Sequence, residues 1–243
     1  MAQLLVAPRA RLNRDRVLQA AVELADRTGI DALSMRRLAE ELGVVPMALY
    51  KHVANKDELL DGMVDVIVAE IDPPDVALGW KAAVRLRVLS ARQMLLRHPW
   101  ARSVLESRTR QTPTVLDYLE STIGIFLAGG FSADLTHHVM HALGSRMWGF
   151  TQELFDTSAG PHQPPADPDA QAAQLQAMAG RYPHILRISG VARHDNSVVA
   201  RGCDDRFEFE FALDLLLDGC ERLRDADWSS TASPTDRTGG TPG

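Results

Sequence analysis

Hydrophobic residues recur along the chain with the period of an α-helix, and no segment alternates for the length of a β-strand. The segment 14–28 carries one apolar stripe, with Asn13 before it as an N-cap and Gly29 after it as a stop. The same pattern predicts further helices over 34–42, 46–53, 57–71, 80–97, 99–107, 113–129, 132–156, 169–181 and 204–224. The sequence therefore predicts an all-α protein.

Turn-forming residues divide these helices into two domains. Asp72-Pro73-Pro74 ends the helix at 57–71, because a proline ring cannot continue a helix. We predict a first domain over residues 1–72 and a larger helical domain over residues 73–226. The segment 227–243 is rich in Ser, Thr, Gly and Pro, and it is predicted to be disordered.

The first domain contains two short helices joined by a tight turn. The turn holds Gly43, which can adopt the left-handed conformation that stops the first helix. Ala39 is small enough to let the two helices cross closely. Two short helices joined in this way form a helix-turn-helix, here over about 34–53, with 57–71 as the helix that connects it to the rest of the chain.

The distribution of charged residues gives a first indication of what this domain binds. The net charge is -6, yet residues 1–56 carry nine Lys and Arg against six Asp and Glu. A mildly basic end on an acidic body fits a protein that presents this end to a polyanion. Polar groups able to bind phosphate surround the second helix: Ser34, Arg36, Arg37, Tyr50, Lys51, His52 and Lys56. This set favours DNA binding over a helical hairpin that only packs.

Residues 14–62, including the stretch LYKHVANKDELL at 49–60, resemble the DNA-binding domain of the tetracycline-repressor-like (TetR-like) family. The resemblance implies phosphate contacts by Ser34, Tyr50, His52 and Lys56. It also implies base contacts by Arg36 and by the stretch Pro46-Met47-Ala48. Because Val45, Pro46, Met47 and Ala48 carry no side-chain amide or hydroxyl, base reading there is expected to be apolar, against thymine methyl groups.

The second domain resembles the family's helical regulatory domain more loosely, over about 80–224. The resemblance is carried by HPW at 98–100, GGFS at 129–132, Trp148-Gly149-Phe150 and FEFALDLLLDGCERL at 209–223. It implies a homodimer and a pocket for a small molecule. The apolar helix faces predict a dimer interface made by Leu135, Val139, Leu143, Phe211, Leu215, Leu216 and Leu223.

Aromatic residues with a few polar neighbours suit an apolar ligand pocket. The predicted lining residues are His98, Trp100, Tyr118, Phe126, His141, Arg146 and Trp148. Each of these is a core residue in the alternative interpretation, and Arg146 then pairs with a carboxylate. The predicted ligand is moderately apolar, and planar or anionic.

Other classes of protein find little support in the sequence. His137 and His141 lie one helical turn apart, but no carboxylate at ligand spacing accompanies them, so we expect no metal and no cofactor. No nucleophile turn such as G-x-S-x-G is present, and no catalytic residue is expected. No apolar run is long enough for a membrane helix, and two cysteines indicate a reducing cytoplasm.

These observations predict a cytoplasmic homodimeric repressor with two partners besides its second subunit. One is double-stranded DNA carrying an inverted-repeat operator, and the other is a small-molecule effector that releases the DNA. An activator or a ligand-blind regulator of the same fold is an alternative. A small helical metalloenzyme using the face of His137 and His141 is a more distant one.

Overall fold

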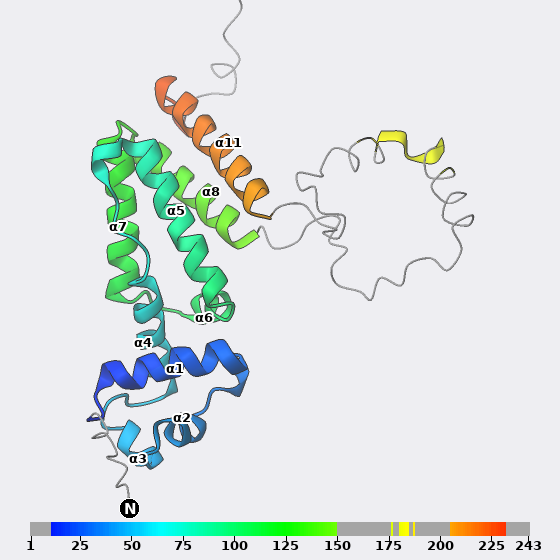
Figure 1. The fold of residues 1–243 in the computed structure, drawn as a ribbon. Helices are drawn as coiled ribbons and strands as arrows, with labels where there is room; N and C mark the ends of the chain where they lie inside the picture. Colours follow the sequence, from blue (N-terminus) through cyan, green and yellow to red (C-terminus); the bar gives the residue numbers. More distant parts are fainter. Residues whose placement is uncertain (1–10, 150–175, 177–179, 185–186, 188–204, 232–243) are drawn as a thin grey trace, which may run out of the picture. The chain divides into compact units, whose positions relative to one another are not determined.

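The computed structural model describes residues 11–149, 176, 180–184, 187 and 205–231, with only the backbone for 145–149 and 205. Its regular elements are α1 (Arg14–Thr28), η1 (Ile30–Ala32), α2 (Met35–Leu42), α3 (Pro46–Leu49), α4 (Lys56–Val68), η2 (Val76–Leu78), α5 (Trp80–Arg97), α6 (Ala101–Ser107), α7 (Pro113–Ala128), α8 (Ala133–Gly149) and α11 (Asp205–Asp225) (Figure 1). The described residues thus confirm the predicted all-α class. None of their helices is long and apolar enough to cross a membrane.

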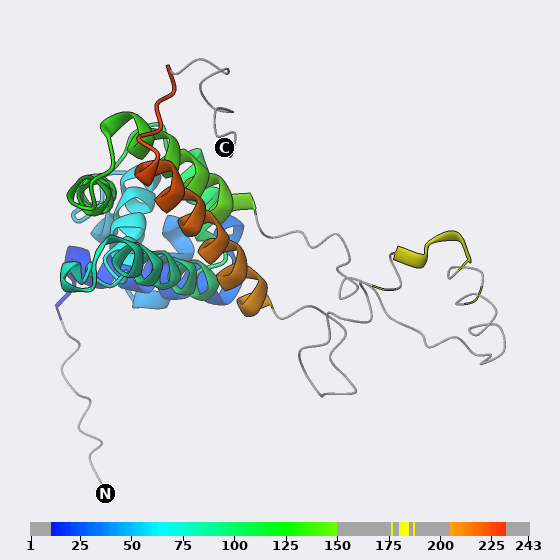
Figure 2. The same ribbon diagram turned by 90° about the horizontal axis from the view of Figure 1, so that it is seen from above.

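The described residues form two compact units. Those up to Met140, together with those from Ala226 onward, make up the first, and those from His141 to Asp225 make up the second. In the first unit α1 packs on α2 and α4, and α4 in turn contacts α6 and α7. Figure 2 shows the same unit from above, with the blue N-terminal helices behind α5.

The helix starts follow local sequence signals. The side-chain oxygens of Asn13, Ser34 and Asn55 each accept a hydrogen bond from the backbone N–H three residues later, at 2.8, 3.2 and 2.8 Å. The carboxylate of Glu58 accepts a further bond from the N–H of Ala54 at 2.7 Å. These bonds satisfy backbone donors that the first turn of a helix leaves without partners.

Two helices end earlier than the sequence pattern predicts. The α3 helix stops at Leu49 rather than at residue 53. The carbonyl oxygen of Leu49 accepts hydrogen bonds from the N–H groups of both His52 and Val53. The α4 helix stops at Val68, and residues 69–71 continue as tighter turns. Such tightening satisfies the last carbonyl groups of a helix when the chain must turn away.

One hydrophobic core runs through the N-terminal part of the first unit. It joins α1, α2, α3 and α4 and extends into Met94 of α5 and Val104 of α6. Fully buried side chains in this cluster include Val17, Leu38, Leu49, Leu59, Met63 and Ile67. Because α5 and α6 share this core with the helix-turn-helix, movement in these helices reaches α1 and α4 through packed side chains.

The first residues of the predicted tail make ordered contacts. The backbone N–H and hydroxyl of Ser230 donate to the carboxylate of Asp134 at 2.7 and 2.8 Å, and these bonds lower the pKa of Asp134. The indole ring of Trp228 lies edge-on against His138, with centroids 5.4 Å apart. The rest of the predicted tail, residues 232–243, lies outside the described residues.

Candidate nucleic-acid interface

The helix-turn-helix is held by a small set of inward-facing residues. Leu38 and Ala39 of α2 and Leu49 of α3 are completely or almost completely buried. Between the helices, Gly43 adopts the left-handed conformation with φ 65° and ψ 38°, which few residues with a Cβ adopt easily. Its N–H donates to the carbonyl oxygen of Glu40 at 3.1 Å and ends α2. The turn therefore sets α3 across α2 with its other face outward.

The outward side of α3 is apolar where it begins. Val45 is 68% exposed and Met47 is 70% exposed, and Pro46 between them is exposed as well. Tyr50, directly after the helix, is 44% exposed. Exposed apolar side chains grouped on one turn point to a surface that meets a partner.

Cationic side chains flank this apolar turn. Arg37, Lys51 and Lys56 are exposed and make no ion pair within the described residues. Arg36 is exposed and lies 3.9 Å from Glu40, which is a loose, solvated pair. Cations without nearby carboxylates remain available to bind the phosphates of a nucleic acid.

The sequence-predicted DNA contacts lie between residues 34 and 56, and the structure leaves most of them exposed. Exposed members are Ser34, Arg36, Arg37, Val45, Pro46, Met47, Tyr50, Lys51 and Lys56, and half-buried members are Ala48 and His52. The hydroxyl oxygen of Ser34 accepts the capping bond of α2, so it also has a structural role. None of the predicted contacts is buried, and their individual roles toward DNA stay predictions.

Comparison with known proteins assigns this arrangement to a family. Residues 17–63 match the description "Bacterial regulatory proteins, tetR family". Residues 73–224, more than half of the chain, match the description "Tetracyclin repressor-like, C-terminal domain". The chain belongs to the TetR family. It is accordingly a ligand-responsive DNA-binding transcriptional regulator, with an N-terminal helix-turn-helix domain and a larger helical domain.

Individual TetR-family proteins resemble the chain over most of its length. The "HTH-type transcriptional repressor DrrR1" of Streptomyces coeruleorubidus is 31% identical over 89% of this chain and 80% of its own. The TetR-family protein ActR of Streptomyces coelicolor, solved with actinorhodin, is 28% identical with a TM-score of 0.63, over 88% of this chain and 98% of its own. A TetR variant from Acinetobacter baumannii AYE, solved with minocycline, is 27% identical with a TM-score of 0.61, over 91% and 97% of the two chains.

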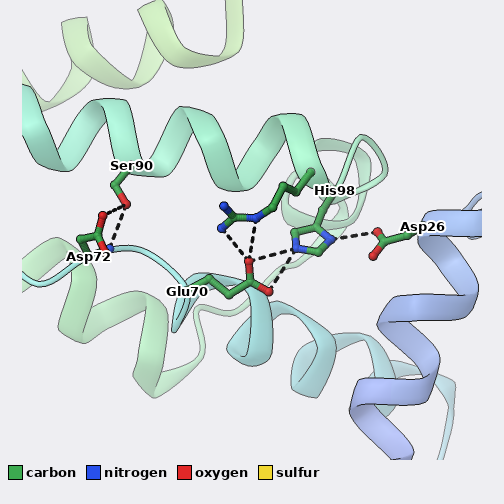
Figure 3. A network of polar contacts seen from close by, with 6 residues as sticks. Asp26, Glu70, Asp72, Ser90 and His98 are labelled. Atoms are coloured by element: carbon green, nitrogen blue, oxygen red, sulfur yellow. Dashed lines mark hydrogen bonds and ion pairs between the residues drawn. The ribbon is translucent and has the colours of Figure 1, made fainter.

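Polar contacts join the helix-turn-helix domain of this TetR-family chain to the start of its regulatory domain (Figure 3). The ring of His98, between α5 and α6, lies with Nδ1 2.8 Å from Asp26 of α1 and Nε2 3.2 Å from Glu70. The indole N–H of Trp100 donates to the same oxygen of Asp26 at 2.6 Å. Arg97 donates to Glu70 at 2.7 Å. We call these five residues the domain junction.

The domain junction gives two sequence-predicted pocket residues a different role in this structure. His98 and Trp100 are both 6% exposed, and their ring N–H and nitrogen groups face carboxylates of the N-terminal domain. Neither therefore offers a free polar group to a ligand. The HPW stretch alone cannot reveal this, because its partners lie in distant parts of the sequence.

A second set of ion pairs connects α4 to the loop after α6. The guanidinium of Arg108 lies 3.3 Å from Asp57 and 3.2 Å from Asp61, and its side chain is largely buried. This contact holds the start of α4, and the domain junction holds Glu70, two residues after its end, so that both are attached to the regulatory domain. The α4 helix is thus held where a shift of the regulatory domain would move it.

Substitution of Asp26 by alanine is expected to lower the free energy of unfolding by about 2–4 kcal/mol. The variant removes the acceptor of two buried ring groups, and each buried group left unsatisfied costs about 1–3 kcal/mol. Urea unfolding at fixed protein concentration measures the change. The matched control is Asp31→Ala, which removes an exposed carboxylate in η1. Equal stability of the two variants would contradict a stabilising role for Asp26.

The other sequence-predicted pocket residues divide into two groups. Phe126 is fully buried and packs in an aromatic cluster with Trp80 and Phe131, at centroid distances of 5.9 and 5.1 Å. Tyr118 is half-buried, and its ring lies 4.5 Å below the guanidinium of Arg87. Burial raises the pKa of Tyr118, so its hydroxyl stays protonated at neutral pH.

The remaining three pocket predictions fall near the end of α8. His141 is exposed, and the side chains of Arg146 and Trp148 lie outside the described residues. The described residues contain no cluster of three or more His, Cys, Asp or Glu side chains arranged to hold a metal ion. On α8 itself, His138 lies 3.6 Å from Asp134, one helical turn away.

The predicted dimer residues also divide by exposure. Those of α8, namely Leu135, Val139 and Leu143, are buried within the single chain. Those of α11 are exposed in the cases of Phe211, Leu215 and Leu223 and half-buried in the case of Leu216. The opposite face of α11 buries Phe209, Leu213, Leu217 and Cys220, and burial raises the pKa of Cys220 to about 11. Of the predicted dimer residues, those of α11 present apolar surface that a second subunit could cover.

Sequence reasoning missed three residues that organise the regulatory domain and its attachment: Asp26, Glu70 and Arg87. Arg87 had a detectable signal, because it falls on the apolar stripe of α5 that includes Val84, Val88 and Ala91. A charged residue on a buried helix face requires partners from a neighbouring element. Asp26 and Glu70 carry no comparable local signal.

Proposed function

We propose that this TetR-family chain is a homodimeric repressor that binds an inverted-repeat operator and releases it when a small molecule binds. The observation that carries the proposal is the surface of α2 and α3, where an exposed apolar turn is bordered by cations without carboxylate partners. A helix-turn-helix of this kind places its second helix in the major groove, and its phosphate contacts fix the register.

The second subunit is proposed to cover the exposed face of α11. Phe207, Phe211 and Leu215 succeed one another at intervals of four residues on this face, and all three are exposed. The rings of Phe207 and Phe211 stack, with centroids 6.3 Å apart. A long apolar stripe beside a fully buried opposite face is typical of a helix that packs on two sides. Symmetric pairing also matches the two half-sites of an inverted repeat.

The effector is proposed to be a polycyclic, largely apolar molecule with several oxygen functions. Two relatives were solved with compounds of this kind, ActR with actinorhodin and the Acinetobacter baumannii TetR variant with minocycline. We propose Tyr118, His141, Arg146 and Trp148 as residues that contact the effector. We propose that Arg146 orients an anionic group of the effector.

The response to the effector is proposed to be a population shift. The ligand must bind more tightly to a conformation in which the two recognition helices no longer match their half-sites. The domain junction and the Arg108 contacts connect α4 to α5 and α6, so they supply a physical path for this coupling. Operator DNA and effector then weaken each other's binding by the same factor.

We propose further that the protein has no catalytic activity of its own, and that it works in the cytoplasm, where its DNA lies. An activator, or a regulator that senses no ligand, would use the same fold and the same DNA-binding surface. The experiment below separates these alternatives from the repressor, because it measures DNA binding with and without candidate effectors.

The chain is expected to select an inverted-repeat duplex from a random pool and to bind it at least about 10³-fold more tightly than a shuffled duplex. Lys56→Ala should reduce the slope of log K against log salt by about 2 for the dimer, since each lost phosphate contact contributes about 0.9. Met47→Ala is the matched variant, because it should alter base preference and leave the salt slope unchanged. An unchanged slope in Lys56→Ala would contradict its role.

A panel of polycyclic compounds tested on the selected duplex completes the experiment. A compound that lowers the affinity for the duplex supports the repressor with a releasing effector. A compound that raises the affinity for the duplex favours the opposite response, in which the effector promotes DNA binding. Selection of no duplex at all would contradict the proposed function.

A further inference from the structure

The most exposed apolar side chains of the helix-turn-helix are grouped at the start of α3. Val45 and Met47 are 68% and 70% exposed, whereas Leu49 on the same short helix is completely buried. The segment from Val45 to Leu49 therefore has one buried face and one exposed face. Val45 and Met47 contribute nothing to the hydrophobic core of the helix-turn-helix. Their apolar surface is available to a partner.

The chemistry of this turn limits what it can recognise on a base. None of the four side chains from Val45 to Ala48 can donate a hydrogen bond, and the only acceptor among them is the weakly accepting thioether sulfur of Met47. In the major groove, adenine, guanine and cytosine present only donors and acceptors, while thymine also presents a C5-methyl group. Apolar side chains can gain free energy from that methyl group, because the contact removes both surfaces from water.

The surroundings of the turn favour DNA over an apolar protein as the partner. Arg37, Lys51 and Lys56 border it, and they have no ion-pair partner within the described part of the chain. Arg36 lies on the neighbouring α2 and is also exposed. An exposed apolar turn with exposed cations close to it along the chain is complementary to a groove that presents methyl groups between two phosphate backbones.

We propose that Val45 and Met47 are specificity-determining residues that read thymine C5-methyl groups in each operator half-site. The inference rests on the proposed function and deepens it, because it names the chemical feature by which the operator is recognised. The hydrogen-bonding edges of the same base pairs are not read by this turn. The half-site is accordingly rich in thymine where α3 enters the groove.

The test uses the duplex selected from a random pool and replaces its thymines, one position at a time, by deoxyuridine. This change removes the methyl group and keeps every hydrogen-bonding group. At positions that Val45 or Met47 contact, we expect affinity to fall about fourfold per methyl group, and about 15-fold when both half-sites are changed. Thymines outside the contacted positions should tolerate the replacement.

Variants of the protein identify the side chain that reads each methyl group. Met47→Ala should bind the thymine duplex more weakly and should lose its sensitivity to deoxyuridine at one position, and Val45→Ala at another. Both residues are exposed, so the variants keep their core. Lys51→Ala is the control, because it should weaken binding to all duplexes and retain the full deoxyuridine effect.

Each outcome bears on one proposal or the other. If a duplex is selected but no thymine in it responds to deoxyuridine, methyl reading is refuted while the proposed function stands. If the response persists unchanged in Val45→Ala and Met47→Ala, another group reads the methyl and the inference is again refuted. If no duplex is selected, the proposed function itself fails. Loss of the response in either variant, with its retention in Lys51→Ala, supports the inference.

Discussion

Replacement of Leu215 by glutamate is expected to produce a monomer that binds the selected operator about 100-fold or more weakly than the native protein. Leu215 is 54% exposed on the outer stripe of α11, so a charge there costs little in a single chain. In a dimer the same charge would be buried without a partner, which is strongly unfavourable. Loss of the dimer removes the gain from binding two linked half-sites, which reaches about 10²–10⁴.

Light scattering measures the mass of the Leu215→Glu variant, and a mobility-shift titration measures its affinity for the operator. Circular dichroism should show unchanged helix content. The matched control is Leu116→Glu on α7, where a leucine with a similar exposure of 52% receives the same charge. The control should remain dimeric. A Leu215→Glu protein that dimerises and binds the operator normally would refute the assignment of this stripe to the subunit interface.

Replacement of Arg87 by methionine is expected to lower the free energy of unfolding by about 3 kcal/mol. Each hydrogen bond from a charged group contributes about 1.5–3 kcal/mol to stability. The cost of burying the charge offsets part of this gain. Arg87 is 7% exposed, and no carboxylate pairs with it among the described residues. Its guanidinium donates to the hydroxyls of Thr122 and Ser121 at 3.0 and 2.6 Å and to the carbonyl oxygen of Asp72 at 2.9 Å.

The Arg87 bonds have a clear structural consequence. They join α5 to α7 and to Asp72, which follows the turns at residues 69–71, and burial lowers the pKa of Arg87 without removing its charge. Methionine fills a comparable volume but leaves the carbonyl of Asp72 without this donor. Arg87→Lys should rescue little, because one ammonium group cannot reach the acceptors on both α7 and Asp72.

Urea unfolding of the native, Arg87→Met and Arg87→Lys proteins at equal concentration checks this prediction. The control is Arg110→Met, which changes an exposed arginine in the loop before α7 and should alter stability by less than about 0.5 kcal/mol. A Met variant as stable as the native protein would show that desolvation of the cation cancels its hydrogen bonds. The hydrogen bonds of Arg87 would then orient α5 and α7 without stabilising the fold.

Helix positions and caps could be predicted closely from the sequence. The α5 helix spans the predicted residues, and the cap at Asn13 acts as predicted. These features depend on interactions within three or four residues, which the order of amino acids specifies directly. The early end of α3 could not be predicted, because burial of Val53 in the core redirects the chain there.

The exposure of the predicted DNA contacts could be predicted for a related reason. A helix-turn-helix packs one stripe inward, so the residues of the other faces become exposed whatever the rest of the fold does. Val45, Met47 and Lys51 are exposed for this reason, and Leu38 and Leu49 are buried. Which base or phosphate each exposed residue meets still depends on DNA and stays a prediction.

By itself, then, the sequence determined the all-α class, the helix-turn-helix and the identity of its outward residues, because each follows from short-range periodicity and turn chemistry. Only the tertiary structure decided that His98 and Trp100 bind Asp26, a partner more than 70 positions earlier in the chain. It also decided that Leu135 is buried while Leu215 is exposed. Polar and apolar side chains on a helix face can serve a core, a pocket or an interface, and the element that packs against them selects among these roles.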